Sequence, residues 1–402
     1  MKDIVERFIN YTKIDTTSND ESGITPSSQE QFILANILKD ELIELNLKDV
    51  EVSDNCFVYG TLASNTDKKC DVIGLSAHLD TSNATSGKNI KARVIKNYDG
   101  KDIKLSDNIY STVKDYPFLA DLKGDDIIVT DGTTLLGGDD KAGIAIIMDT
   151  LRCLNENNIK HGEIRVCFSP DEEIGEGIHH VDLNKFKCDY AYTLDGGLPN
   201  VLYYENFNAA HADITFNGVS IHPGSAKDKM INAIQLAMDF HSQLDEKARP
   251  EKTEKREGFN HILELSGTCQ SAKDSYIIRN HDINLLHQQM QDFRDIAARM
   301  NQQYGREVVT LEIGEDYHNM KDCFKDKMYI VEKAAQAIAS EGLTVEYDAM
   351  RGGTDGAILS YMGLPTPNLG TGAYNCHGNH ELVDINHMEK LVKIVTKIVE
   401  SE

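Results

Sequence analysis

Strand-like and helix-like segments alternate along the first half of this 402-residue chain. A buried-type strand at 71–77 precedes a glycine-rich turn at 137–143, which opens a helix, and further strand-like runs cover 163–169 and 190–194. Strands that alternate with helices in this way pack as one sheet with helices on its faces. The alternation therefore predicts an α/β fold.

A different pattern begins near residue 208. A strand at 211–216, a helix near 230–238, two strands near 260–268 and 273–281, a polar helix at 284–303 and a strand at 308–313 follow one another. This β-α-β-β-α-β order, about 100 residues long, is sufficient for an α+β domain of its own. The α/β pattern then resumes. We therefore predict a discontinuous main domain, 1–207 and 317–402, with a second domain, 208–316, inserted into it.

Charge and cysteine usage limit the partners and the compartment. A formal net charge of -24 excludes nucleic acids and anionic membranes as favourable partners, because both would repel the chain. The first residues lack a secretory signal pattern, and no run of about 18 apolar residues indicates a membrane helix. The eight cysteines are dispersed and form no C-x-x-C pair, as is typical of reduced thiols. These features predict a cytoplasmic protein.

Acidic and histidine side chains stand where predicted strands end or a helix begins. They are His78 and Asp80 after the 71–77 strand, Asp139 and Asp140 before the helix, Glu172 and Glu173 after the 163–169 strand, and Asp195 after the next strand. In open α/β sheets, ligands bind at the carboxyl ends of strands, so these groups can converge. His377 can join them if the C-terminal segment folds back onto the same sheet.

The residue types suit a two-metal site. Imidazole and carboxylate ligate Zn²⁺ and leave positions open to water, and one carboxylate can bridge two metals. Asp80 could orient His78, and of the adjacent Glu172 and Glu173, one could ligate while the other accepts a proton. Each motif alone has a structural explanation: a strand-end cap, a charged first helical turn, or a solvated Glu-Glu pair. Their occurrence together favours the metal site.

Longer motifs carry a resemblance that covers essentially the whole chain: R-F-I-N-Y, H-L-D-T-S, G-D-D-K-A-G, P-D-E-E-I-G, L-D-G-G, I-H-P-G-S-A-K, Y-I-I-R, R-G-G-T-D-G-A and N-C-H-G-N-H-E. With these motifs the chain resembles the two-zinc aminoacylase and carboxypeptidase-like metallopeptidases, in particular their tripeptide aminopeptidases. The resemblance implies a catalytic domain with a mixed central sheet flanked by helices. It also implies that the inserted domain, a four-stranded sheet with two helices, is a lid and dimerisation domain.

The resemblance implies a role for each strand-end residue. His78, Asp140 and Asp195 would hold one zinc ion, and Glu173, His377 and a bridging Asp140 would hold the other. Co²⁺ or Mn²⁺ could substitute, because the ligand set accepts all three metals. Glu172 would be the general base, and Asp80 would orient His78. The peptide bond after Asp140 is expected to be cis.

Four residues are implied in substrate binding. His222 would stabilise the oxyanion, Arg279 would bind the C-terminal carboxylate, and Asn232 and Arg351 would line the cleft. Guanidinium is geometrically suited to a carboxylate. The structural alternatives are a loop histidine before a proline turn at His222, a surface strand arginine at Arg279, and a tight structural loop at R-G-G-T-D-G.

The implied activity is metal-dependent release of the N-terminal residue from short peptides, mainly tripeptides. The alternatives are a deacylase or dipeptidase of the same family acting on N-acylated amino acids, and a catalytically inactive metal-binding protein. The expected partners are peptides with free termini, with neither nucleic acid nor membrane. A homodimer through the inserted domain is implied by the resemblance, although no apolar stripe in the sequence requires it.

Overall fold

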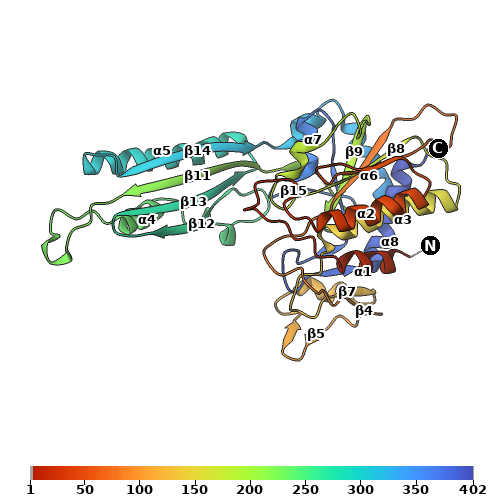
Figure 1. Cartoon of the computed structure of the whole chain (residues 1–402), viewed down its shortest axis with the longest axis horizontal. Helices are drawn as coiled ribbons and strands as arrows, with labels where there is room; N and C mark the ends of the chain where they lie inside the picture. The colour runs from red at the N-terminus through yellow and green to blue at the C-terminus, as the bar shows by residue number, and fades with distance from the viewer. Residues whose placement is uncertain (1–2, 402) are drawn as a thin grey trace. The chain divides into compact units, whose positions relative to one another are not determined.

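The computed structural model describes residues 3–401, which divide into two compact units. The first unit comprises the residues up to Tyr204, Cys323–Tyr347 and the residues from Thr354 onward, and the second comprises Glu205–Asp322 and Asp348–Gly353. Figure 1 labels many of the elements of both units. The role of the inserted 208–316 domain as a lid and dimerisation domain stays a prediction.

An eight-stranded mixed sheet forms the centre of the fold and confirms the predicted α/β class. In spatial order its strands are β1 (Lys48–Val52), β2 (Val58–Leu62), β8 (Ile164–Ser169), β3 (Ile73–His78), β9 (Tyr190–Gly196), β16 (Asn368–Gly370), β10 (Val201–Asn206) and β15 (Glu346–Met350). β3 runs parallel to β8 and β9, whereas β1 and β2 pair antiparallel.

The position of β3 explains its sequence and locates the site. All six residues of this strand are buried, as expected for a parallel strand covered on both faces. His78, its last residue, pairs with Ser169 at the end of β8, and Ser76 pairs with Thr193 in β9. The carboxyl ends of β3, β8 and β9 therefore meet at one edge of the sheet, where the predicted ligands follow.

Helices and apolar clusters cover the sheet. The helices are α1 (Ile4–Thr12), α2 (Gln31–Glu44), α3 (Gly138–Glu156), α6 (Met328–Ser340), α7 (Asp355–Tyr361) and α8 (Ile385–Val399). α3 packs on β3 and β9 and also contacts α1 and α8. A separate cluster packs Leu359 of α7 against Tyr59 of β2 and Cys167 of β8. Because α3 is almost wholly buried, its first turn is fixed beside the end of β3.

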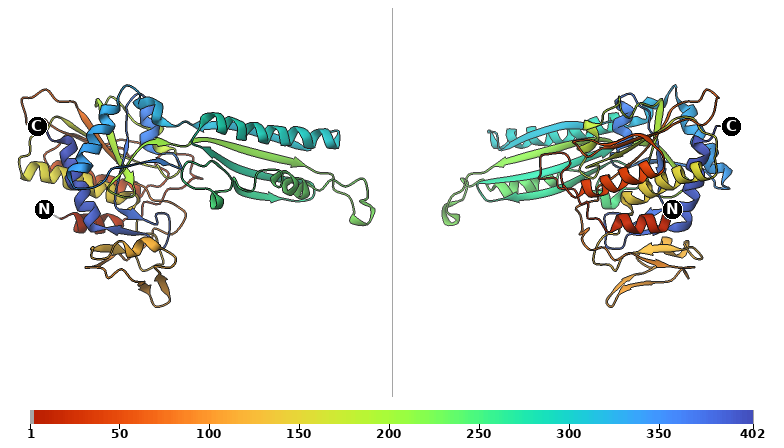
Figure 2. Two further views of the ribbon diagram at one scale, coloured as in Figure 1. Left: turned by 180° about the vertical axis from the view of Figure 1, so that it is seen from behind. Right: turned by 45° about the vertical axis from the view of Figure 1, so that its right-hand side comes forward.

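The connection between β3 and α3 contains structure that the sequence pattern did not predict. β4 (Arg93–Ile95) and β7 (Ile127–Val129) join β18 (Leu382–Asp384) and β17 (Ala373–Tyr374) in a four-stranded sheet of order β17-β18-β7-β4. β5 (Ile103–Ser106) and β6 (Ile109–Ser111) form a hairpin, and β4 and β5 appear in orange in Figure 2. This sheet anchors the C-terminal segment that leads to and from His377.

The second unit has the predicted four strands and two helices. Its antiparallel sheet has the order β12 (Phe259–Gly267), β13 (Ser271–Asn280), β11 (Asn208–Asn217) and β14 (Val309–Tyr317). The helices are α4 (Ala233–His241) and α5 (Ile283–Tyr304), and α5 runs along β14 in Figure 1. Phe216, Phe240 and Phe293 join the sheet and both helices in one core. Asp282 caps the start of α5, and Gly305, at φ 62°, ends it.

One carboxylate is buried in this core without compensation. Asp274 shares the helix-covered face of β13 with Ala272 and Tyr276 and is 2% exposed. Neither of its oxygens has a hydrogen-bond partner within residues 3–401. Burial raises its pKa from 3.8 to about 6. The folded chain therefore holds the proton more tightly than the unfolded chain, and stability falls as pH rises from about 4 to about 6.

Replacing Asp274 by leucine is expected to stabilise the second unit by about 2–3 kcal/mol near pH 8 and by much less near pH 4. Thermal unfolding at the two pH values measures the difference. Asp274→Asn keeps the shape and removes only the titration, and Asp213→Asn, at an exposed acid on β11, is the matched control. If Asp274→Leu stabilises the protein by the same amount at both pH values, the buried charge is not the cause of the stabilisation.

Within residues 3–401, no helix combines the length and the apolar character needed to cross a membrane.

Candidate metal centre

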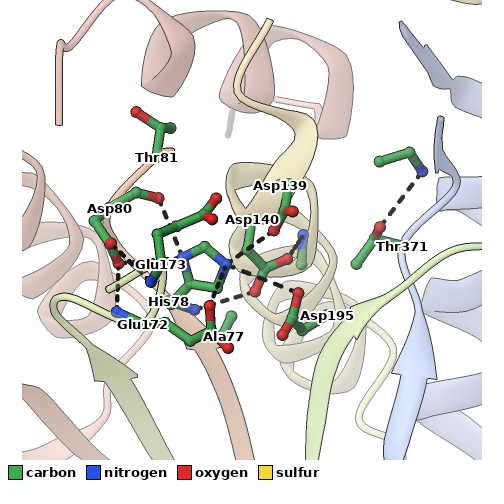
Figure 3. Close-up of polar contacts among 12 residues, drawn as sticks. Ala77, His78, Asp80, Thr81, Asp139, Asp140, Glu172, Glu173, Asp195 and Thr371 are labelled. Carbon is green, nitrogen blue, oxygen red and sulfur yellow. Dashed lines mark hydrogen bonds and ion pairs between the residues drawn. The ribbon is translucent and has the colours of Figure 1, made fainter. Parts of the chain in front are cut away.

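The predicted ligands of the first unit come together at the edge where β3, β8 and β9 end. His78 closes β3, Asp195 lies in β9, Glu172 and Glu173 follow β8, and Asp139 lies in the first turn of α3. Figure 3 shows the carboxylates of these residues around the imidazole of His78. His377 reaches the same cluster from the loop between β17 and β18. The C-terminal segment thus folds back onto the sheet, which is the condition for His377 to join the cluster.

His78 presents Nε2 to the carboxylates. This nitrogen lies 2.9 Å from Asp139 Oδ1 and 3.8 Å from Asp195 Oδ1, while Nδ1 lies 3.1 Å from the carbonyl oxygen of Asp80. A proton on Nδ1 is held by that carbonyl, which leaves Nε2 free to ligate. Burial alone would lower the pKa of His78, but hydrogen bonds to Asp139, Asp195 and Asp80 raise it well above its ordinary value.

Asp139 lies between the two histidines. Its Oδ1 is 2.9 Å from His78 Nε2, and its Oδ2 is 3.1 Å from His377 Nε2. His377 Nε2 also lies 2.9 Å from Glu173 Oε2. Burial would raise the pKa of Asp139, but hydrogen bonds to His377 and His78 lower it. A carboxylate whose two oxygens contact two different histidines is placed as a ligand that bridges two metal ions would be.

Asp140 has different contacts. Its Oδ2 accepts the backbone N–H of His78 at 3.1 Å, and its Oδ1 accepts that of Gly143 at 3.2 Å. Its ligand atoms also lie near those of His78 and Asp195, within 4.8 Å of one another. The wholly buried Asp140 carboxylate therefore accepts two backbone hydrogen bonds, which join the end of β3 to the first turn of α3.

The prediction of a cis bond after Asp140 is wrong by one position. The cis peptide bond joins Asp139 to Asp140. Both residues have non-helical backbone angles, φ -88° and ψ 104° at Asp139 and φ -122° and ψ 30° at Asp140, so the regular helix begins after them. The D-D-K motif does not reveal where the helical conformation starts.

Asp80 contacts the glutamate loop as well as His78. Its Oδ1 accepts the backbone N–H of Glu172 at 2.9 Å, and its Oδ2 accepts that of Glu173 at 3.1 Å. Oδ1 also lies 3.3 Å from His78 Nδ1. One carboxylate thereby fixes the ring of His78 and the backbone that carries both glutamates.

The cluster fits divalent cations by its charge and its donor atoms. Five carboxylates, those of Asp139, Asp140, Glu172, Glu173 and Asp195, surround the imidazoles of His78 and His377. Burial raises the pKa of Glu173 and Asp195 to about 7 and that of Asp140 and Glu172 well above the ordinary range. Glu173 Oε1 is buried without a hydrogen-bond partner within residues 3–401. Bound cations would relieve this excess negative charge.

Glu381 supports the site, a role that the sequence did not indicate. Its Oε2 accepts the backbone N–H groups of Leu136 at 2.6 Å and Gly137 at 2.8 Å, and its Oε1 accepts that of Asp139 at 3.2 Å. Burial raises its pKa to about 7. The carboxylate joins the turn before α3 to the segment that carries His377. The sequence signal that could have identified Glu381 is its position in the N-C-H-G-N-H-E motif, four residues after the predicted ligand His377.

The four residues predicted to bind substrate belong to the second unit. His222 Nδ1 accepts the Gly224 N–H at 3.2 Å, and the Asn232 side chain accepts the Ile234 N–H at 3.0 Å as the cap of α4. Arg279 lies over the Tyr317 ring at 5.1 Å and has a 13% exposed side chain. Arg351 lies over Phe207 and Phe259 and donates to Thr253 Oγ1 at 2.8 Å. Their contribution to a substrate cleft stays a prediction.

Comparisons with known proteins agree with this geometry. The model of the Peptidase family M20/M25/M40 matches residues 131–401. A peptidase T of Clostridium perfringens is 46% identical over 400 residues, which cover 99% of this chain and 98% of that protein.

Two solved structures have the same fold. An aminopeptidase PepT from Bacillus cereus has a TM-score of 0.75 and 22% sequence identity, and the match covers 98% of this chain and 97% of that one. A tripeptidase from Staphylococcus aureus has a TM-score of 0.79 and 21% sequence identity, and the match covers 98% of this chain and 96% of that one. The chain therefore belongs to the peptidase family M20/M25/M40, and its full-length similarity extends to the peptidase T members of that family.

Proposed function

We propose that this protein is a metal-dependent aminopeptidase that removes the N-terminal residue from tripeptides. The observation that carries the proposal is the position of Asp139 between His78 and His377, with Glu172 in the same cluster, 4.0 Å from His78 Nε2. This arrangement supports a two-metal hydrolytic centre. The 46% identity to a peptidase T supports the substrate class.

Two Zn²⁺ ions would be held in adjacent sites. His78 and Asp195 would ligate one ion, His377 and Glu173 would ligate the other, and Asp139 would bridge them, in place of the bridging Asp140 predicted from the sequence. Asp140 would instead hold the backbone through its two N–H acceptor bonds. When bound, the metal pair would polarise the peptide carbonyl and lower the pKa of a water molecule. Co²⁺ or Mn²⁺ would fit the same donors.

Glu172 would move the proton. Its carboxylate would accept a proton from the water as the water adds to the first peptide carbonyl, and would then deliver it to the departing amine nitrogen. Its side chain is 16% exposed, and the Asp80 carboxylate holds its backbone N–H. Burial raises the pKa of Glu172, and a bound cation would oppose that rise and favour the ionised base.

The second unit would recognise the substrate. His222 accepts the Gly224 N–H at Nδ1, so in the neutral ring the proton lies on Nε2, which could donate to the developing oxyanion. Arg279 would bind the C-terminal carboxylate and so limit peptide length, with Asn232 and Arg351 lining the cleft. A homodimer through this unit and a cytoplasmic location are part of the same proposal.

A substrate panel tests the function. The metal-loaded and the chelated protein are given di-, tri- and tetrapeptides, both free and N-acetylated. The proposal expects N-terminal release from free tripeptides only, and its loss on chelation. Cleavage of the N-acetylated substrates would identify a deacylase, preference for dipeptides would identify a dipeptidase, and no cleavage in any arm would indicate a metal-binding protein without activity.

Arg279→Ala is expected to raise KM for free-acid tripeptides about 10–100-fold, because a charge-assisted hydrogen bond to the carboxylate contributes about 1.5–3 kcal/mol. The rate with C-terminally amidated tripeptides should change little. Arg279→Lys tests the guanidinium geometry, and thermal unfolding of each variant checks that the Tyr317 contact is not simply lost to misfolding. If both substrate classes weaken equally, Arg279 does not bind the carboxylate.

A further inference from the structure

A second group of metal-ligating side chains lies outside the predicted metal centre. It consists of Asp125, which precedes β7, Asp384, which ends β18, and His387, in the first turn of α8; we call it the Asp384 cluster. One ligand atom from each residue lies within 4.8 Å of the others. The proposed peptidase reaction uses none of the three.

Asp384 is the buried member of this group. It is 0% exposed, and its Oδ1 accepts the backbone N–H of His387 at 2.9 Å as the cap of α8. Its Oδ2 accepts no hydrogen bond from an N–H or hydroxyl group within residues 3–401 and lies 3.8 Å from His387 Nδ1, and the Asp384 and Asp125 carboxyl groups lie within hydrogen-bond distance of each other. A buried carboxylate oxygen with an unfilled lone pair, directed at an imidazole and a second carboxylate, requires a proton or a cation.

The backbone on both sides of the cluster is fixed. Asp384 pairs with Ile127 across β18 and β7, and the Asp126 carbonyl accepts the Ile385 N–H at 2.9 Å. The Asn386 side chain accepts the Asp126 N–H at 2.9 Å. These bonds hold the Asp125 segment and the start of α8 together without using the three ligand groups, so the donors are preorganised.

Few basic side chains lie near the cluster, and Lys390, on the same helix as His387, is one of them. Lys96, the nearby base on the β4 side, pairs with Asp126 at 2.7 Å. No lysine or arginine in the described chain, residues 3–401, forms an ion pair with Asp125 or Asp384. The Tyr374 hydroxyl lies 3.2 Å from His387 Nδ1, the nitrogen that faces Asp384, and a cation bound at that nitrogen would replace this hydrogen bond.

We propose that the Asp384 cluster binds one first-row divalent cation, Zn²⁺ or Mn²⁺, in addition to the catalytic pair. Two carboxylates balance the charge of one such ion, and an imidazole with two carboxylates is a donor set that these metals accept. The imidazole favours these metals over Mg²⁺ and Ca²⁺, which prefer donor sets made of oxygen alone. The ion would join the start of β7 to the start of α8 and stabilise the sheet that carries the His377 segment.

Metal stoichiometry tests the proposal. The chelated full-length protein is equilibrated with Zn²⁺ or Mn²⁺, freed of excess metal and analysed for bound ion. His387→Gln and Asp384→Asn are each expected to bind one ion fewer per chain than the wild type. Asparagine keeps the Oδ1 acceptor and therefore the cap of α8. Glu389→Gln, at an exposed acid on the same helix, is the matched control and should bind as many ions as the wild type.

A second readout is independent of the catalytic centre. In the Asp139→Asn background, added Zn²⁺ should still raise the thermal midpoint by about 2 °C or more, and adding His387→Gln should reduce this shift. Equal metal content in the wild type and both cluster variants would overturn the proposal. If Asp384→Asn is also more stable than the wild type without metal, Asp125 and Asp384 share a proton rather than a cation. Neither outcome would affect the peptidase proposal, which the substrate panel tests separately.

Discussion

Replacing Glu172 by glutamine is expected to lower kcat for tripeptide hydrolysis by about 10²–10⁴-fold, the usual contribution of a positioned general base. Glutamine has nearly the same shape but cannot take a proton from water. The backbone of residue 172 is held by Asp80 and does not depend on the side chain, so the loop should keep its position. Steady-state kinetics with a free tripeptide, together with metal analysis, measures the effect.

Metal content distinguishes a lost base from a lost ligand. Glu172→Gln should bind as much metal as the wild type, whereas Glu173→Gln should bind less, because Glu173 contacts His377. Glu176→Gln, at an exposed glutamate of the same loop, should be indistinguishable from the wild type in both assays. A Glu172→Gln enzyme that works within tenfold of the wild-type rate would remove Glu172 as the base.

The second large effect separates the two adjacent aspartates. Asp139→Asn is expected to lose one or two bound ions per chain relative to the wild type, and to fall below about 1% of wild-type activity, because the bridging ligand is gone. Asp140→Asn should keep its metal but lose stability. Its amide group cannot accept both backbone N–H groups, and an unsatisfied buried donor costs about 1–3 kcal/mol.

Each variant serves as the control for the other, because both replace one carboxylate by an amide at neighbouring positions of the chain. Metal analysis and thermal unfolding on the same preparations give the two readouts. The reverse result, with metal lost from Asp140→Asn and kept in Asp139→Asn, would restore the bridge to Asp140, as the sequence predicted.

Strand patterning predicted the fold class and the convergence of the strand ends that carry the candidate ligands. An apolar run that ends in His78 marks a central strand, and similar runs before Glu172 and around Asp195 bring their ends to the same edge. Periodicity also separated the four strands and two helices of the second unit from the rest. These features depend on local patterns, which a sequence displays directly.

Features that depend on backbone angles or distant contacts were not predictable in the same way. Which aspartate of D-D-K faces the histidines depends on the non-helical angles before α3. The contacts of Glu381 with the 136–139 turn join segments more than 240 residues apart. The short strands β4, β7, β17 and β18 have two or three residues each, too few for a period to be visible.

Metal dependence of the rate tests the two-metal account most directly. The His387→Gln protein, which lacks the proposed additional site, is chelated and then titrated with Zn²⁺, and bound ion and tripeptide hydrolysis are measured on the same samples. The account predicts that the rate reaches its plateau when two ions per chain are bound. A full rate with one ion per chain, or after complete chelation, would contradict it.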